Sequence, residues 1–275
     1  MPPTDLRFAA NISILYGHLP LLTRPGAAAA DGFTAVESWW PFSTPVPDDR
    51  EADQFAGALA DAGVQLVAMN LPEGDMRAGD RGLLSSPGRA AQFRASLPGA
   101  AEFARRTGCR ILNALYGNRE PGADWAEQDE IAHESLRLAA DAARAAGARI
   151  VLEAISAREA PDYPLNNAPA AVAALTAAEL AGASDLGLLC DLYHHGANGE
   201  DLPALIAKHA GLIAHVQIAD TPGRGRPGSG ILDYPGAFAA LSASGYGGWI
   251  GLEYEPTRDP AVDYDWMPAV TGGAR

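Results

Sequence analysis

Four oxygen-bearing side chains each end a short apolar run that has the length of a strand. They are Glu153, Asp191, Gln217 and Glu253. A strand buried on both faces gains nothing from a terminal carboxylate unless something beyond its end uses the charge. If these ends meet in one partly dry cleft, the three carboxylates repel one another, and a divalent cation is the simplest way to hold them together. Carboxylate and amide oxygens suit Mg²⁺ or Mn²⁺ better than zinc, so the sequence predicts a site for one of these two ions.

Each acid taken alone has a second interpretation, as a helix cap or as the partner of an arginine in the following loop. The shared site is favoured because the same feature recurs at successive strand ends. His194 stands one turn beyond Asp191, where it would contact a substrate, whereas His195 is more typical of packing. His215 lies on the same face as Gln217 one layer deeper, which predicts a hydrogen-bonded core histidine or a residue that supports a ligand.

Strand-like and helical runs alternate along the whole chain, with no linker or low-complexity segment between them. The expected strands cover 6–11, 33–37, 64–70, 109–115, 149–153, 188–194, 212–217 and 248–253. The expected helices cover 19–30, 48–62, 89–107, 124–146, 168–181, 202–209 and 235–244. This alternation is typical of parallel βαβ units, and eight strands predict a closed (β/α)₈ TIM barrel, an α/β fold whose site lies at the C-terminal strand ends.

One domain is expected over residues 1–275, with the barrel at about 6–256 and a C-terminal tail after it. The length fits, because α/β barrels commonly run to about 250 residues as a single domain. An open, doubly wound sheet is the alternative fold. It requires a glycine-rich phosphate-binding loop after the first strand, and Asn11-Ile12-Ser13 provides none. The barrel is therefore the prediction.

The composition restricts the partners of the protein. The formal net charge is −14 and the pI is near 4.7, so the chain lacks the basic surface that binds nucleic acid or anionic lipid. The first residues show no signal-peptide pattern, and no apolar run approaches the roughly 20 residues of a membrane span. Cys109 and Cys190 lie in apolar strand-like runs, which favours reduced, buried thiols. We expect a cytoplasmic protein that acts on a small molecule.

Two loops are expected to form the wall of the site. The turn after the second strand carries Trp39, Trp40 and Phe42, and rings at a barrel mouth would exclude water from a reactive intermediate. Asn70 ends the third strand, and with Trp39 it is expected to contact the substrate. The polar loop 71–88 is too long for a plain connector and is typical of a functional lid. Clustered tryptophans are also enriched in subunit interfaces, so a homo-oligomer that buries them is the alternative.

Four segments of the chain resemble the hydroxypyruvate isomerase family, which belongs to the xylose isomerase-like barrel superfamily. They are Phe8-Ala9-Ala10-Asn11-Ile12-Ser13, Asn70-Leu71-Pro72-Glu73-Gly74-Asp75, His215-Val216-Gln217-Ile218-Ala219-Asp220 and Gly248-Trp249-Ile250-Gly251-Leu252-Glu253-Tyr254. The likeness extends over nearly the whole chain, and the last two segments are its more specific part. The 2-oxo-tetronate isomerases share these motifs, so the resemblance indicates the reaction class more narrowly than the substrate.

The resemblance implies a role for each site residue. It implies that Glu153 and Glu253 are the acid–base pair. It implies that the metal ligands are Glu153, Asp191, Gln217 and Glu253. It also implies that His194 and Arg224 bind the oxygens or the carboxylate of a small hydroxy-keto acid or sugar-acid substrate. Arg224 suits a carboxylate because its guanidinium can donate two parallel hydrogen bonds.

The expected reaction is the interconversion of hydroxypyruvate and tartronate semialdehyde. A proton leaves one carbon and returns to its neighbour through an enediolate, which needs a carboxylate on each side and a cation near both oxygens. A 2-oxo-tetronate isomerase and a sugar epimerase of the same fold are the alternatives of the same class. An endonuclease IV-like phosphodiesterase would need a histidine-rich zinc cluster and a basic surface, which six histidines and a charge of −14 do not favour. A non-catalytic binding barrel would lack the acid pair, which is present.

The chain departs from the family pattern at three positions in the last two loops. Arg226 and Ile231 stand where the family pattern has glutamates, and Glu255 stands where it has a lysine. Two unrelated charge reversals would each leave a repelled partner, whereas one exchange across a single pair would keep the attraction. The sequence therefore predicts an ion pair between Arg226 and Glu255 that joins the two loops.

Overall fold

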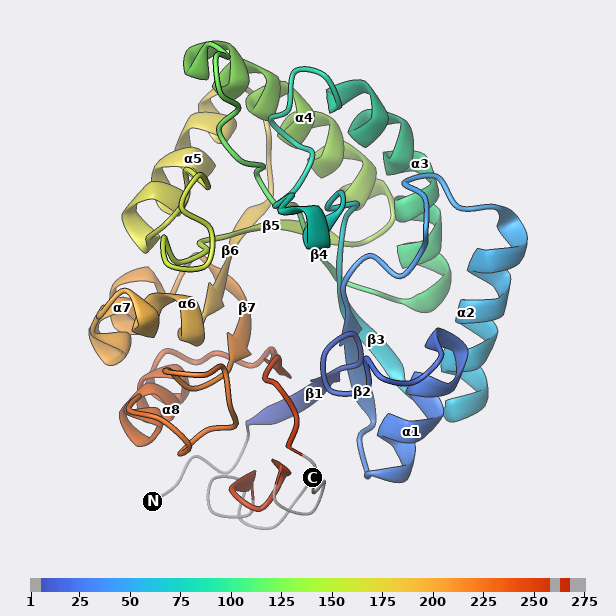
Figure 1. Cartoon of the computed structure of the whole chain (residues 1–275), viewed down its shortest axis with the longest axis vertical. Helices are drawn as coiled ribbons and strands as arrows, with labels where there is room; N and C mark the ends of the chain where they lie inside the picture. Colours follow the sequence, from blue (N-terminus) through green and yellow to red (C-terminus); the bar gives the residue numbers. More distant parts are fainter. Residues whose placement is uncertain (1–5, 258–262, 268–275) are drawn as a thin grey trace.

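The computed structural model describes residues 6–257 and 263–267. Eight parallel strands pair in sequence order and close into a barrel between β1 and β8 (Figure 1), which confirms the predicted TIM barrel. The strands are β1 Arg7–Asn11, β2 Ala35–Ser38, β3 Gln65–Asn70, β4 Ile111–Asn113, β5 Arg149–Glu153, β6 Leu186–Asp191, β7 Ile213–Ile218 and β8 Trp249–Leu252. Each strand begins within two residues of its predicted start. Strand β6 ends at Asp191 rather than at residue 194, because a helix begins at once after Asp191.

Helices cover the outside of the barrel (Figure 1). They are α1 Arg24–Ala30, α2 Asp49–Ala62, α3 Ala90–Thr107, α4 Trp125–Ala145, α5 Ala168–Leu180, α6 Leu192–Ala197, α7 Leu202–His209 and α8 Tyr234–Ala243, with short 3₁₀ turns η1 Leu21–Thr23 and η2 Met76–Ala78. Six of them begin at an acidic or amide side chain that accepts a backbone N–H of the first turn: Asp48, Asp124, Asn167, Asp191, Asp201 and Asp233. These caps satisfy donors that the helix itself cannot bond.

The strand register sets polar side chains side by side at one rim of the barrel. Asn11 is opposite Glu37, and Asp191 is opposite Gln217. Beneath this rim, Ala9, Ala35 and Val67 form a small buried apolar cluster. Side chains two residues apart on a strand share a face, so Ala9 lies below Asn11 and Ala35 lies below Glu37. These strands are thus apolar below the rim at Ala9 and Ala35 and polar at the rim itself.

The segment Asp263–Met267 returns to the barrel after β8 and makes a contact that the sequence did not reveal. Arg226 pairs with Asp265, with Nη1 3.1 Å from Oδ1. Glu255 is exposed and makes no ion pair among the described residues. The predicted ion pair between Arg226 and Glu255 is therefore wrong, because this returning segment supplies the acid instead. Ile231 is 79% exposed, and the structure gives no reason for its presence there.

Two further expectations concern the thiols and the membrane. Cys109 and Cys190 are both free and buried, as predicted. Within residues 6–257 and 263–267, no helix combines the length and the apolar composition needed to cross a membrane.

Candidate active site

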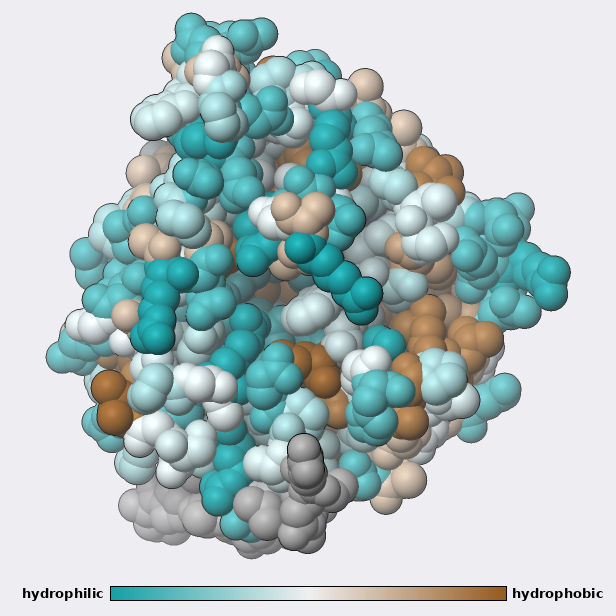
Figure 2. Space-filling model, viewed as in Figure 1, coloured by the Kyte–Doolittle hydropathy of each residue, from teal (hydrophilic) through white to brown (hydrophobic). Residues whose placement is uncertain are grey.

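A cavity of about 290 Å³ opens at the carboxyl ends of the strands. Six of the residues predicted for the site line it: Trp39, Asn70, Glu153, His194, Arg224 and Glu253. The other two, Asp191 and Gln217, are directly opposite each other on β6 and β7. Figure 2 is viewed from the same side as Figure 1 and shows a hollow near the centre of this face with hydrophilic residues around it. The volume is near the lower end of the about 300–1,000 Å³ usual for ligand pockets, which suits a small substrate.

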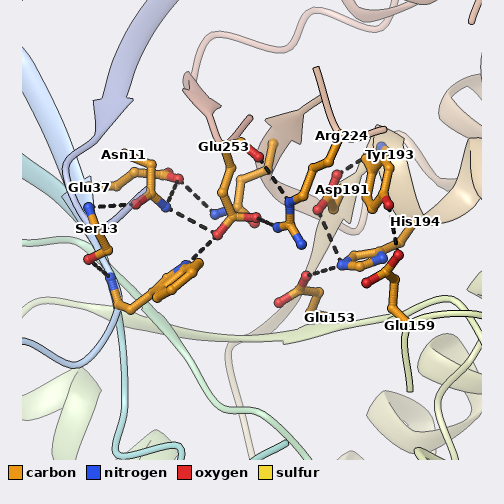
Figure 3. A network of polar contacts seen from close by, with 12 residues as sticks. Asn11, Ser13, Glu37, Glu153, Glu159, Asp191, Tyr193, His194, Arg224 and Glu253 are labelled. Carbon is orange, nitrogen blue, oxygen red and sulfur yellow. Dashed lines mark hydrogen bonds and ion pairs between the residues drawn. The ribbon is translucent and has the colours of Figure 1, made fainter. Parts of the chain in front are cut away.

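Glu253 follows β8 and accepts hydrogen bonds on both carboxylate oxygens (Figure 3). Its Oε1 accepts from Asn11 Nδ2 at 3.1 Å and from Trp39 Nε1 at 2.5 Å. Its Oε2 accepts from Arg224 Nη2 at 2.5 Å, and Arg224 Nε also donates to the Glu253 carbonyl at 3.2 Å. Donors from three separate parts of the chain therefore fix the orientation of this carboxylate.

Glu37, at the end of β2, supports the same side of the site. Its Oε1 accepts from Asn11 Nδ2 at 2.9 Å and from Gln217 Nε2 at 2.7 Å, and its Oε2 lies 2.6 Å from His215 Nε2. The bond from Gln217 fixes its amide, so that Oε1 is left buried without a partner among the described residues. Our prediction for His215 agrees with this contact. We did not predict Glu37 as a site residue, although its predicted strand also ends on an acid, the feature that identified Glu253.

The opposite side of the cavity, at β5 and β6, holds its polar groups more loosely. Glu153 Oε2 accepts from Asn113 Nδ2 at 2.8 Å. His194 Nε2 lies 3.6 Å from both Glu153 Oε1 and Asp191 Oδ2, which is too far for a hydrogen bond. Asp191 Oδ1 caps α6 by accepting from Tyr193 N, whereas its Oδ2 is buried and unpartnered within the described part of the chain. Figure 3 shows Arg224 between this group and Glu253.

These residues fit a divalent cation. Glu153, Asp191 and His194 each offer one ligand atom, and the three atoms lie within 4.8 Å of one another. Two predicted ligands, Asp191 and Gln217, keep a buried oxygen that no described group satisfies. Buried acceptors without a donor are costly, and a cation would satisfy them. The structure thus groups His194, predicted as a substrate contact, with the metal-capable acids, while Glu253 is already hydrogen-bonded to Arg224.

Burial changes the proton affinity of the carboxyl groups at the site. It raises the pKa of Glu153 well above its usual value, and the charges of Glu253 and Asp191 raise it further. It also raises the pKa of Glu253 to about 7, although Arg224 opposes the shift. Burial lowers the pKa of His194 far enough to keep the imidazole neutral, and Arg224 acts in the same direction. Two carboxyls that hold their protons near neutral pH are suited to acid–base catalysis.

The aromatic residues of the turn after β2 line two different cavities. Trp39 and Asn70 line the site cavity, as predicted. Trp40 and Phe42 instead line an adjacent groove of about 670 Å³, which shares Trp39 with the site. His195, the second histidine after β6, does not line the site cavity. Its Nδ1 lies 2.5 Å from Glu200 Oε2, in agreement with the prediction that it packs.

The family model for the xylose isomerase-like TIM barrel matches residues 25–269. The chain belongs to this family. A Streptomyces coelicolor protein, provisionally assigned as a hydroxypyruvate isomerase, is 50% identical over 98% of this chain and 99% of its own. The 2-oxo-tetronate isomerase of Cupriavidus necator is 35% identical over 97% of this chain and 99% of its own. Further relatives, at 32–36% identity, carry one of these two names.

A solved structure of similar sequence agrees in fold. A Brucella melitensis protein described as an AP endonuclease of family 2 superposes with a TM-score of 0.86 and 34% identity, over 98% of this chain and 99% of that one. The named relatives are isomerases, so the predicted enzyme class, an isomerase of the hydroxypyruvate isomerase kind, is confirmed. The resemblance that the four sequence segments indicated is confirmed with it.

Proposed function

We propose that this isomerase interconverts hydroxypyruvate and tartronate semialdehyde. The observation that carries the proposal is the pair of buried carboxyls, Glu153 and Glu253, which line one small cavity from β5 and from the end of β8. Both have a raised pKa, and a general acid or base is most effective when its pKa lies near the working pH. The Streptomyces coelicolor relative supports hydroxypyruvate as the substrate.

The reaction moves two protons and no heavy atoms. One carboxylate takes the proton from C3 of hydroxypyruvate, which leaves an enediolate. The other carboxyl group gives a proton to C2, while the hydroxyl proton on the C3 oxygen passes to the C2 oxygen. The carbonyl has then moved from C2 to C3, which is tartronate semialdehyde. Glu153 and Glu253 act as this pair, and Trp39 excludes water on the side of Glu253, where its indole N–H already bonds the carboxylate.

Glu153, Asp191 and His194 would hold a divalent cation, with Gln217 Oε1 and Glu253 as further ligands. We propose Mg²⁺ or Mn²⁺, because oxygen atoms dominate this set. When bound, such an ion stabilises the negative charge that develops on the two substrate oxygens. His194 remains neutral through burial, so it is able to act as a ligand or to hydrogen-bond a substrate oxygen.

A 2-oxo-tetronate is the second candidate substrate. The Cupriavidus necator relative favours it, and so does the groove of about 670 Å³ that adjoins the cavity and would take an additional carbon. A phosphodiesterase is disfavoured by the site itself. Its metal-capable group has a single histidine among the described residues, and the net charge of −14 repels a nucleic acid backbone. A cytoplasmic location and a homo-oligomeric state remain predictions from the sequence.

A substrate assay tests the proposal directly. The purified protein is given hydroxypyruvate or a 2-oxo-tetronate, after treatment with EDTA and after addition of Mg²⁺ or Mn²⁺, and the product is followed by proton NMR in D₂O. We expect turnover of hydroxypyruvate that needs the ion, with deuterium at C2 of the tartronate semialdehyde. Turnover of the 2-oxo-tetronate alone would select the second candidate. Turnover of neither would refute both.

A further inference from the structure

Besides Arg224 and the exposed Arg77, the half-buried Arg81 lines the cavity from the loop between β3 and α3. Its Nη1 donates to the backbone carbonyls of Asp80 at 2.7 Å and Met76 at 3.3 Å. Neither acceptor is charged, and across residues 6–257 and 263–267 Arg81 makes no ion pair. The neighbouring carboxylate is engaged elsewhere, since Asp80 Oδ2 pairs with Arg89 Nη1 at 2.5 Å. Arg81 therefore brings a positive charge and unused N–H donors to the cavity.

The backbone holds Arg81 in place. Its carbonyl accepts from Gly117 N at 2.9 Å, in the loop that follows β4. The next residue, Gly82, has φ +107°, and a Cβ there would lie 2.0 Å from the Leu115 carbonyl oxygen. Only glycine permits so close an approach of the two loops. Arg81 thus stands on a backbone packed against the β4 loop, and the bonds from its Nη1 to the Asp80 and Met76 carbonyls orient the guanidinium.

Arg224, which the sequence suggested for the substrate carboxylate, is in a different situation. Its guanidinium already pairs with Glu253 Oε2 at 2.5 Å and lies over the Tyr193 ring, 5.1 Å from the centroid. A substrate carboxylate would have to compete with Glu253 for the same N–H groups. Arg224 is thus neutralised by a carboxylate, whereas Arg81 makes no ion pair within the described residues. The third arginine at this cavity, Arg77, is exposed, so that solvent screens its charge.

We propose that Arg81 binds the carboxylate of the substrate, and that it makes the site select 2-oxo and 2-hydroxy acids over neutral sugars. This assignment rests on the proposed function and names the residue that distinguishes its substrate class. A guanidinium with free N–H groups matches a carboxylate with two parallel hydrogen bonds. The charge of Arg81 also acts on His194, which lines the same cavity 3.6 Å from Glu153. Arg224 then serves to orient Glu253.

The first test uses binding without turnover. Glycerate carries a carboxylate and no carbonyl, and glycerol is its uncharged counterpart. Titration calorimetry of glycerate into EDTA-treated protein should show Kd raised by about 10- to 100-fold in Arg81→Met, which is the usual value of hydrogen bonds to a charged group. Arg81→Lys keeps the positive charge and the contact with the loop. Its Kd for glycerate should therefore lie between the values for the wild type and Arg81→Met. Arg50→Met, on the exposed surface of α2, is the matched control and should bind as the wild type does.

The second test separates substrate binding from chemistry. With hydroxypyruvate, Arg81→Met should raise KM and leave kcat nearly unchanged, whereas Arg224→Met should lower kcat. The ratio of kcat/KM for hydroxypyruvate over the neutral dihydroxyacetone should fall in Arg81→Met by the same factor as glycerate binding. Unchanged glycerate binding in both Arg81 variants, with a loss in Arg224→Met, would overturn the proposal. If the wild type turns over no acid, the proposed reaction is wrong. The comparison of glycerate binding with glycerol binding then still decides whether Arg81 binds a carboxylate.

Discussion

The two sides of the barrel mouth hold their polar groups in opposite ways. On the β8 side, all four carboxylate oxygens of Glu37 and Glu253 have a hydrogen-bonding partner. On the β5–β6 side, Asp191 Oδ2 and His194 Nδ1 are buried and unpartnered within the described residues. An unsatisfied buried group costs about 1–3 kcal/mol, so the second side is stable only because the rest of the fold supports it. The carboxylates of Glu37 and Glu253 are therefore satisfied by the chain alone, whereas Asp191, His194 and the amide oxygen of Gln217 present buried polar atoms that a ligand would satisfy.

The largest expected effect is on catalysis. Glu153→Gln and Glu253→Gln should each lower kcat by about 10²–10⁴-fold, since each removes one member of the acid–base pair. Their stabilities should differ. Glu253→Gln presents an NH₂ group to donors from Asn11, Trp39 or Arg224 and should lower Tm, whereas Glu153→Gln removes a repelled buried carboxyl and should not. Steady-state rates and melting curves in EDTA check both, with the exposed Glu179→Gln as control. Retained turnover in either variant would exclude that residue from the pair.

Next in size is the response to metal removal. Asp191→Asn keeps the α6 cap, because an asparagine oxygen also accepts the Tyr193 N–H. Burial raises the pKa of Asp191. The EDTA-treated variant should therefore melt above the EDTA-treated wild type. With Mn²⁺ at about 100 times its Kd, the wild type should gain about 2.7 kcal/mol and overtake the variant. Melting curves that keep the same order in both buffers would show that Asp191 does not bind the ion.

A smaller effect, a loss of stability, is expected on the β8 side, where the carboxylate of Glu37 is fully hydrogen-bonded. Glu37→Gln turns an NH₂ group toward donors from Asn11 and Gln217, or toward His215, and should cost about 1–3 kcal/mol of unfolding free energy. Glu159→Gln is the matched variant across the cavity, where an exposed carboxylate accepts from Tyr193 alone. It should cost less than Glu37→Gln in urea denaturation. Equal losses of unfolding free energy in the two variants would mean that hydrogen bonds stabilise the two sides of the cavity to the same extent.

The smallest expected effect is a pH-dependent change in Tm. Burial raises the pKa of Glu73 to about 7, against the hydrogen bond from Asn70, from an ordinary value of about 4.5. A raised folded-state pKa gives stability that is complete below pH 4.5 and is lost as the pH rises to 7. Glu73→Gln cannot ionise at this position. As the pH rises from 4.5 to 7.5, the Tm of the variant should therefore increase by a few degrees relative to the Tm of the wild type. A constant difference across this range would show that Glu73 does not titrate there.

The fold and the strand-end acids were accessible from the sequence because both depend on local patterns. An apolar run of strand length that stops at a polar residue marks the rim, and Glu153, Asp191, Gln217 and Glu253 were all found in this way. Glu37 carries the same mark, but its partners His215 and Gln217 are 178 and 180 residues away. Its role appears only once the closed barrel has brought β2 and β7 to one interior.

Two other features could not be predicted from local patterns in the sequence. The role of Arg81 depends on which acids lie near it, and Asp80, its direct neighbour, pairs with Arg89 instead. The partner of Arg226 lies in the segment that returns to the barrel after β8, at Asp265. Charge patterns in a sequence suggest pairs between neighbouring loops, but the choice among several acids is made by the path of the backbone.

Barrel closure also determines when, during synthesis, the site comes into being. Asn11, in the first strand, donates to Glu253, which follows the last strand, across a separation of 242 residues. The ribosome releases β1 long before β8, so the nascent chain carries β1 and the most recent strand as open sheet edges, with unpaired backbone groups, until the end. A chain interrupted before residue 253 lacks the second carboxylate altogether, whatever part of the barrel it has already folded.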